Sequence, residues 1–469
     1  MRHTLPALVL ALVSLVAAPA SAQLVVGPGQ TYTTIGAAAA AATDGDTIEI
    51  QAGTYHEEVV WSANGLTIRG TGGDVVIDMT GMALTRQGGK GIFIVDGADI
   101  TIEGITFVGA SVPDGNGAGI RWQGGGMLTV RNCVFRNNED GILGGNHGDN
   151  VALIENNEFV GNGLGDFGFT HSVYINEIDT LTFRGNWSHD LADGPDIGHL
   201  FKSRAHHNYV IANRLTAQAS HSSYELQLPE GGIAYVIGNL IEQSAAGGNH
   251  NIVSIGGDGM QWPDHHVFLV NNTIVNDDTN GPFINATAPI DLEIVNNLFI
   301  GPGAVVSGGH VVRMAGNLQP PASVLVDAAS FDYHLVDGSM PIDMGVDPGS
   351  DGAMSLVPML QYLHPRSTSA RTIVGSAIDV GAYEHGQPVV EVDAGTTPGN
   401  DAGSTPGTDA GSTPGVDGGG TALRDGGSTG TPASSSGCGC RAGARGPGLG
   451  ALSLVALALL GATRRRRRR

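Results

Sequence analysis

A short pattern of apolar and polar positions recurs through the middle of the chain. It consists of an apolar residue, a variable one, a small residue or asparagine, an asparagine, another variable residue and a second apolar one, as in Leu269 to Ile274. Such a repeat, mostly at roughly 25–29 residues, accommodates one coil of three short strands whose alternate side chains face core and solvent. Its fourth position is occupied by Cys133, Asn157, Asn186, Asn213, Asn239, Asn272 and Asn297.

Stacked coils predict a structural role for these asparagines. Successive coils would lie about 4.8 Å apart, so an inward asparagine at each turn can bond the turns above and below and satisfy their buried backbone groups. Ahead of the repeats, Thr34 and the alanine-rich stretch 35–42 predict a short helix that covers the open edge of the first coil. We therefore expect an all-β parallel β-helix, a solenoid of three-strand coils with an N-terminal capping helix.

The ends of the chain predict export and sorting. Residues 1–22 have a basic start, an apolar run and a small-residue cleavage site before Gln23, which is typical of a secretory signal peptide. Residues 23–386 would form the β-helix domain. Residues 387–435 repeat Asp-Ala-Gly-Ser/Thr-Thr-Pro-Gly, a composition that cannot form a core, and are expected to be a disordered stalk.

The last segment, 436–469, combines Cys438 and Cys440 with an apolar run that ends in six arginines. It resembles the myxobacterial sorting tail called MYXO-CTERM. The resemblance implies processing near the cysteines by export and sorting machinery, membrane contact only through the tail before processing, and anchoring at the outer cell surface. An ordinary tail anchor, with the arginines in the cytoplasm, is the alternative.

Charge narrows the choice of partner. Nine of the 23 basic residues lie in the two ends, which leaves 14 against 45 acidic residues and a net charge near −31 for residues 23–435. Such a surface repels nucleic acid and anionic lipid at long range, so no nucleic acid is expected as a partner. An acidic polysaccharide would be repelled too unless cations intervene. Only Cys133 lies in the folded region, so no internal disulfide can stabilise it.

Two stretches resemble a known fold family. The opening 45–55 is similar to that of β-helical polysaccharide lyases and their relatives, and the stretches 331–335 and 378–384 resemble the closing segment of bacterial β-helix proteins of the pectate lyase-like superfamily. The resemblance spans about 23–386. It implies a right-handed parallel β-helix and a polysaccharide as the partner.

Candidate chemistry gathers in four successive coils. Nine of the 16 histidines fall between positions 171 and 266, and Lys202 is one of only two lysines. When the four strands are aligned by alternation, Val173, Phe201, Tyr224 and Ile252 are expected to point inward. Tyr174, Lys202 and Glu225 would then form an outward column, with Asn176, Arg204 and Gln227 beside them and His171, His199 and His250 in another column.

This surface has two interpretations. Lys202 and Glu225 could be a cross-coil ion pair of little consequence, with the histidines as polar fillers. Alternatively, the face is a trough for a sugar chain. Residues 201–203 resemble the stretch that carries the catalytic lysine in alginate lyases of the chondroitinase B type. That resemblance implies a lysine base, an arginine on the next coil and often Ca²⁺, but Gln227 stands where the family places its arginine, and Arg204 would have to substitute.

The expected reaction is β-elimination from a uronate, which needs a base and neutralisation of the carboxylate. We expect catalytic roles for Lys202, Arg204, Tyr174, His199 and Glu225. Because Glu225 beside Lys202 would raise the pKa of the lysine, either Ca²⁺ neutralises Glu225 or Tyr174 is the base. No residues are assigned to a metal. Substrate binding is expected of His171, Asn176, Gln227 and His250.

Two other functions stay open. The same scaffold could be a non-catalytic surface adhesin or glycan-binding module, since the fold does not decide function. A glycoside hydrolase would need a carboxylate pair, for which Asp190, Asp193 and Asp196 are candidates. The stretch 187–190 has its residues in the wrong order for the Trp-x-Asp-His of pectate lyases, and the paired histidines 206–207 and 265–266 lie at turns, where adjacent histidines rarely share one zinc ion.

Overall fold

The computed structural model describes residues 21–85, 90–164, 170–192 and 198–387. All of these lie in the first of two compact units, which ends at Pro398. The expected signal peptide (except residues 21 and 22), the stalk (except residue 387) and the sorting tail lie outside the described residues, and so do Asp193 and Asp196. The described part of the chain holds no helix long and apolar enough to cross a membrane.

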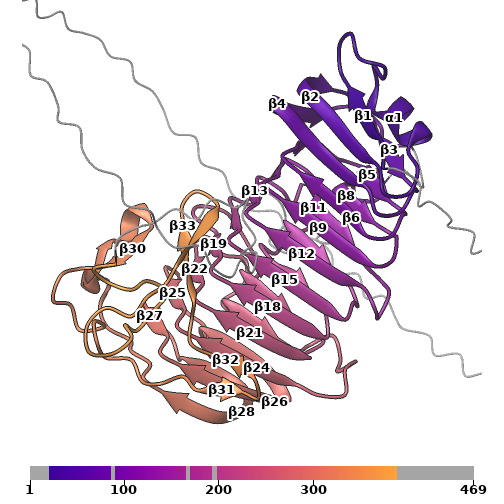
Figure 1. Ribbon diagram of the computed structural model, residues 1–469. Helices are drawn as coiled ribbons and strands as arrows, with labels where there is room; N and C mark the ends of the chain where they lie inside the picture. Colours follow the sequence, from indigo (N-terminus) through magenta and orange to yellow (C-terminus); the bar gives the residue numbers. More distant parts are fainter. Residues whose placement is uncertain (1–20, 86–89, 165–169, 193–197, 388–469) are drawn as a thin grey trace, which may run out of the picture. The chain divides into compact units, whose positions relative to one another are not determined.

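Within the described residues, one sheet of 28 strands winds through the domain, and all its pairings are parallel. The strands of successive coils lie side by side in chain order (Figure 1). Each pairs with the strand in the same position of the next coil, so the chain forms a parallel β-helix with three rows of strands. The expected all-β solenoid is confirmed.

The first row contains β3 (Val59–Trp61), β5 (Gly91–Val95), β8 (Ala118–Trp122), β11 (Asp140–Gly144), β14 (Val173–Ile175), β17 (Lys202–Ser203), β20 (Leu226–Leu228) and β23 (Val253–Ile255). The second contains β1 (Gln23–Val26), β2 (Thr47–Tyr55), β4 (Thr67–Asp78), β6 (Ile100–Glu103), β9 (Met127–Arg131), β12 (Val151–Glu155), β15 (Thr180–Arg184), β18 (His207–Ile211), β21 (Ile233–Ile237) and β24 (His266–Val270). The third contains β7 (Thr106–Val108), β10 (Val134–Arg136), β13 (Glu158–Val160), β16 (Trp187–His189), β19 (Arg214–Thr216), β22 (Leu240–Gln243), β25 (Thr273–Asn276) and β27 (Leu298–Ile300).

Two long strands each pair with strands of two different rows. The strand β4 pairs with both β6 and β7, and β26 (Ile284–Val295) pairs with both β23 and β24. The last strand of the stack is β28 (Val306–Ala315), which pairs with β26. At the other end, α1 (Ile35–Ala41) confirms the predicted capping helix, and the Thr34 hydroxyl accepts a hydrogen bond from the Ala37 N–H at 3.2 Å.

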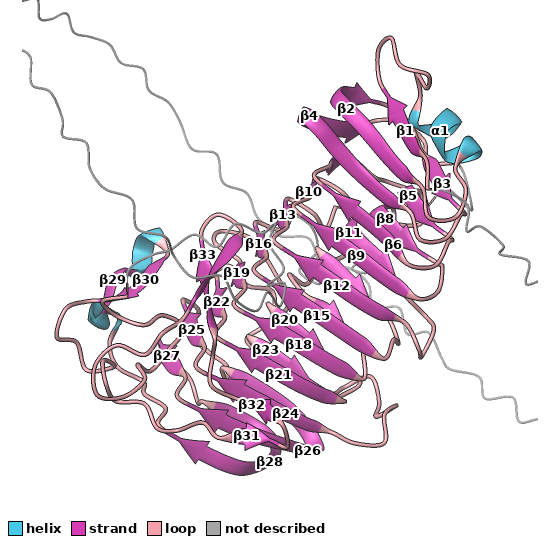
Figure 2. Cartoon of the chain, viewed as in Figure 1, coloured by secondary structure: helices cyan, strands magenta, loops and turns pink. Residues whose placement is uncertain are grey.

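The C-terminal segment folds back along the β-helix as short 3₁₀ turns and antiparallel hairpins (Figure 2). Its largest buried side chains, Tyr333, Tyr362 and Tyr383, pack against outward leucines of the third row such as Leu240 and Leu298. The segment thereby covers part of that row. Its elements are η2 (Ala322–Val324), β29 (Leu325–Asp327), η3 (Ala328–Ser330), β30 (Asp332–Leu335), β31 (Ser350–Asp351), β32 (Met354–Ser355), β33 (Leu360–Leu363) and β34 (Ser367–Ala370).

The asparagine ladder is present as predicted. The Asn239 amide donates to Asn272 Oδ1 at 3.0 Å and to the carbonyl of Val210 at 2.8 Å. Its own Oδ1 accepts from both the side chain and the backbone N–H of Asn213. The ladder begins at the backbone of Cys133 and continues past the sequence repeat to Asn317. Each rung satisfies buried backbone groups of a neighbouring coil, which fixes how the coils stack.

Asn239→Leu is therefore expected to destabilise the domain by about 1–3 kcal/mol, because the buried donors and acceptors of two coils lose their partners. Chemical denaturation of the variant and the wild type measures the difference. Asn280→Leu is the control, since Asn280 is exposed and outside the ladder. Equal stability of the Asn239 variant and the wild type would contradict the structural role of the ladder.

Candidate functional site

The outward face of the first row carries the predicted chemistry, but in a register that differs from the predicted one. Tyr174 lies beside Lys202 as expected. The next neighbour of Lys202 is Gln227 rather than Glu225, and Ser254 follows on β23. We call the outward side of β8, β11, β14, β17, β20 and β23 the Lys202 face.

The predicted alignment of Glu225 with Lys202 is therefore wrong by two residues. The backbone of His199 forms a parallel β-bridge with that of Tyr224 on the next coil. Tyr224 therefore does not share the inward column of Phe201. The inward residues of the next two coils are Leu226 and Val253 instead of Tyr224 and Ile252. The shift of two residues at Leu226 leaves the alternation of inward and outward positions unchanged, so the sequence pattern could not reveal it. In the following coil the shift is one residue, and Ile252 and Val253 are both buried and apolar.

Glu225 is fully buried and belongs to another environment. The Ser222 hydroxyl donates to its Oε1 at 2.5 Å. Burial raises the pKa of Glu225 well above its usual range, which favours the protonated, neutral form. The predicted ion pair with Lys202 is absent, and with it the reason to expect that Glu225 raises the pKa of the lysine or needs Ca²⁺ to neutralise it.

The amine of Lys202 makes no ion pair with an acidic side chain of the described residues. Its Nζ lies 4.8 Å from the centre of the Tyr174 ring, and among the residues that the structure describes it makes no hydrogen bond or ion pair. The side chain is half-buried. Burial, and next the positive charge of Arg204, lower the pKa of Lys202. A lysine of this kind is more easily neutral than an exposed one, as a general base requires.

Arg204 is held in place by its neighbours. Its Nε donates to the Tyr174 hydroxyl at 2.8 Å, and its terminal nitrogens form ion pairs with Glu230 and, at 2.5 Å, with Asp258. Two carboxylates thus compensate its charge, which leaves little for a substrate carboxylate. The arginine orients the Tyr174 hydroxyl, and burial raises the pKa of that hydroxyl, so Tyr174 stays protonated at neutral pH.

The three histidines do not form the predicted column. His171 and His199 are adjacent, with ring centres 4.6 Å apart, but both are buried, and burial lowers their pKa values well below the usual range. They are neutral groups at the edge of the first row. His250 lies elsewhere, with an exposed side chain whose Nδ1 contacts Asp278. The neighbour of His199 on the next coil is Tyr224.

Arg121 is a candidate that sequence analysis missed. It lies on β8 in the same outward column, two coils before Tyr174, with Leu143 between them. Its Nε and Nη1 are buried without a hydrogen-bond partner. It lines a pocket of about 360 Å³ together with Trp122, Gln123, Gly144, Gly145, Asn146, His147 and the predicted substrate-binding residue Asn176. The sequence did offer a signal for Arg121, because its strand could have been aligned with that of Lys202, which would have placed Arg121 at an outward position.

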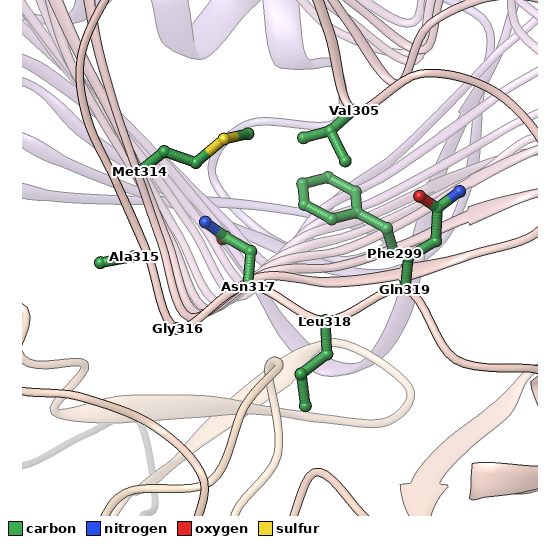
Figure 3. Close-up of a pocket in the computed structure, with 8 residues that line it drawn as sticks. All are labelled: Phe299, Val305, Met314, Ala315, Gly316, Asn317, Leu318 and Gln319. Atoms are coloured by element: carbon green, nitrogen blue, oxygen red, sulfur yellow. The ribbon is translucent and has the colours of Figure 1, made fainter.

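Other candidate groups lie away from the Lys202 face. Asp190 follows β16 of the third row, and its Oδ2 lies 2.8 Å from Nδ1 of His189. The ligand atoms of Asp179, His206 and His207 come within 4.8 Å of one another, the one such metal-type group among the described residues. A further pocket, lined by residues such as Phe299, Val305 and Met314 of the last coils, has no titratable side chain (Figure 3).

Comparison with known proteins gives the same architecture. Residues 64–241 match the family model described as a right handed beta helix region. A search of curated proteins found no match. The pectate lyase Pel9A is 16% identical, with a TM-score of 0.53 over 78% of this chain and 96% of that structure.

An alginate lyase from a Paenibacillus species is 15% identical, with a TM-score of 0.42 over 64% of this chain and 97% of that structure. At such identities the likeness to Pel9A concerns the fold alone, and it agrees with the strand pairing found here. The chain is a right-handed parallel β-helix of the kind that pectate lyase Pel9A also has.

Proposed function

We propose that the Lys202 face binds a uronate-containing polysaccharide and cleaves it by β-elimination. The observation that carries this proposal is the amine of Lys202, half-buried, without an acidic partner among the described residues, and with a lowered pKa. Pectate lyase Pel9A, which has a similar fold, acts by its name on pectate, a polyuronate. The polysaccharide partner follows from the same comparison.

The residues can divide the proton transfers between them. Neutral Lys202 takes the proton from the carbon next to the uronate carboxylate. The electron pair left there forms a carbon–carbon double bond, and the glycosidic bond to the leaving sugar breaks. The leaving oxygen takes a proton from the Tyr174 hydroxyl, which the raised pKa keeps protonated. Of the two assignments left open by the sequence, this geometry favours Lys202 as the base.

The substrate carboxylates need positive charge or hydrogen-bond donors. Gln227, beside Lys202, offers its amide to the sugar being cleaved. Arg121, three coils or about 14 Å from Lys202, would meet the carboxylate of a neighbouring sugar. Around Lys202 the described residues gather no set of three acidic or histidine ligands, and we derive no step from Ca²⁺.

A binding-only role is the second candidate function. It is favoured because Glu230 and Asp258 already compensate the charge of Arg204. It is also favoured because Gln227 stands where alginate lyases of the chondroitinase B type have an arginine. One assay separates the two: the mature protein is incubated with alginate, glycosaminoglycans, pectate and neutral glycans, with and without Ca²⁺. A lyase releases unsaturated uronates that absorb ultraviolet light, a hydrolase releases only reducing ends, and an adhesin retains the glycan uncut.

Arg121→Gln is expected to raise the KM for the polysaccharide about tenfold or more, because a charge-assisted hydrogen bond to a carboxylate is lost. Steady-state kinetics, or binding where no cleavage occurs, measures the change. Arg131→Gln is the matched control, on the next strand of the same coil, where Arg131 is already paired with Glu103 at 2.6 Å. A similar KM in both variants would remove Arg121 from the binding surface.

We also propose that the protein is exported and anchored at the outer cell surface, with the tail processed near Cys438 or Cys440. The proposal is based on the order of the stalk, the two cysteines, the apolar run and the six arginines in the sequence. Mass spectrometry of protein released from the cell surface is expected to find no peptide beyond this region. Recovery of the six terminal arginines on surface protein would instead favour the tail anchor.

A further inference from the structure

A second polar pocket, of about 440 Å³, lies on the third row rather than on the Lys202 face. Its floor is built by β16 and β19, and its walls by the C-terminal segment that folds back over this row. We call it the Arg214 pocket. Its size is within the range of small-ligand sites. It brings together Trp187, His189, Arg214, Phe331, His334 and Tyr383.

The permanently charged side chain of this pocket is Arg214. The Nε of Arg214 is buried without a hydrogen-bond partner, and no ion pair of Arg214 is present among the described residues. The guanidinium carbon lies 5.4 Å from the centre of the Trp187 ring and 5.8 Å from that of Phe331. Aromatic faces hold the guanidinium group in place but do not compensate its charge.

The two described carboxyl groups that line this pocket, those of Asp190 and Asp332, have other partners. Asp190 contacts His189 Nδ1 at 2.8 Å, and Asp332 contacts His334 Nδ1 at 2.6 Å. Burial raises the pKa of Glu242, on the next coil, to about 8, so that this side chain is mostly neutral at pH 7. Arg214 is therefore the group of the pocket whose charge is left for a ligand.

The wall over Arg214 is held in an unusual conformation. Phe331 has a φ of 60°, in the left-handed region that bulky residues rarely adopt. Its backbone N–H bonds the carbonyl of Ala328 and closes the turn of η3. The strained residue places its ring above the guanidinium, and strain of this kind is often retained where a ligand is bound.

We propose that the Arg214 pocket binds a carboxylate-bearing sugar unit of an acidic glycan, as a second attachment point on a different row from Lys202. The guanidinium would hold the carboxylate by two parallel hydrogen bonds, and the aromatic walls would contact the apolar side of the sugar ring. The inference takes its glycan class from the proposed function, but it does not require that the protein cleaves the glycan.

Calorimetric titration of the mature protein with monomeric galacturonate and galactose tests the proposal. In a Lys202→Ala background, we expect galacturonate to bind at least about tenfold more tightly than galactose. Arg214→Gln is expected to abolish this preference, and Arg214→Lys to keep part of it because the charge remains. Arg136→Gln is the matched control, an exposed outward arginine of the same row outside the pocket, and is expected to bind like the parent.

The outcomes separate this proposal from the proposed function. Equal binding of the two sugars, or an unchanged preference in a folded Arg214→Gln variant, overturns the pocket. Binding that is lost with Lys202→Ala but kept with Arg214→Gln places the sugar on the Lys202 face and also overturns it. If Arg214→Gln fails to fold, Arg214→Lys and the loss of the preference at high salt decide. A galacturonate preference in a protein that cleaves no glycan supports the pocket and rejects the lyase.

Discussion

Lys202→Ala is expected to lower the rate of glycan cleavage by on the order of a hundredfold or more, because it removes the proposed general base. The domain should stay folded, since the side chain is half-buried on an outward sheet face and contributes little to the core. Release of unsaturated uronate, followed by its ultraviolet absorbance, measures the loss. The thermal unfolding curve of the variant should match that of the wild type.

Lys90→Ala is the matched control, because Lys90 is the only other lysine of the chain. Its amine is paired with Asp114 at 2.8 Å and lies away from Tyr174. Full activity of Lys202→Ala would reject the mechanism. A variant that binds the polysaccharide less tightly, in a protein that never cleaves it, would identify the Lys202 face as a binding surface.

The pH dependence follows from the direction of the Lys202 shift. A general base must be neutral, so activity is expected to rise with pH as the lysine loses its proton. Burial lowers the pKa of Lys202, which moves this rise to a lower pH than an exposed lysine would give. A rate that falls over the same pH range would contradict the assignment of Lys202 as the base.

Arg371→Met is expected to destabilise the C-terminal segment by about 3–5 kcal/mol, because it leaves the carboxylate of Glu384 buried without its partner. Arg371 donates to Glu384 Oε2 at 3.0 Å from Nη2 and to the carbonyl of Gly381 at 2.8 Å. The side chains of both members of the pair are almost wholly inaccessible to solvent. Hydrogen exchange of residues 331–384, together with chemical denaturation, measures the effect.

Arg69→Met is the control for this change. Arg69 pairs with Glu49 across two coils, but its side chain is 42% exposed, so the pair should contribute no more than about 1 kcal/mol. Similar losses in the two variants would show that burial of the Arg371–Glu384 pair is not what holds the segment. Loss of the segment should also open the Arg214 pocket, because Phe331, His334 and Tyr383 form its walls.

The repeat alone was enough to predict the stacking of the coils. Each asparagine of the series finds its partner one coil away, so a period in sequence translates directly into a contact in space. The capping helix was equally local, since Thr34 and the alanines after it suffice to begin and continue a helical turn. The ladder depends on neighbours whose positions the repeat specifies, and the capping helix depends on residues next to one another in the sequence.

The register of the strands in the first row could not be predicted from the sequence pattern. Alternation defines which side chains point outward, but a shift by two residues preserves it, and so Gln227 rather than Glu225 lies beside Lys202. The pKa of Lys202 depends on this difference, because a charged glutamate at that position would have raised it. The candidate base was predicted from its rarity in the chain, and its electrostatic surroundings were not.

The sequence by itself determined the coil and its ladder, because these rest on contacts that recur at a fixed spacing, and it determined the cap because that helix depends on neighbouring residues. Only the tertiary structure decided which charges are compensated. Arg204 finds Glu230 and Asp258 from two separate loops, whereas Arg121 and Arg214 find no acidic partner among the described residues. The pairing of a charge depends on side chains brought together by turns of irregular length, and no repeat encodes those turns.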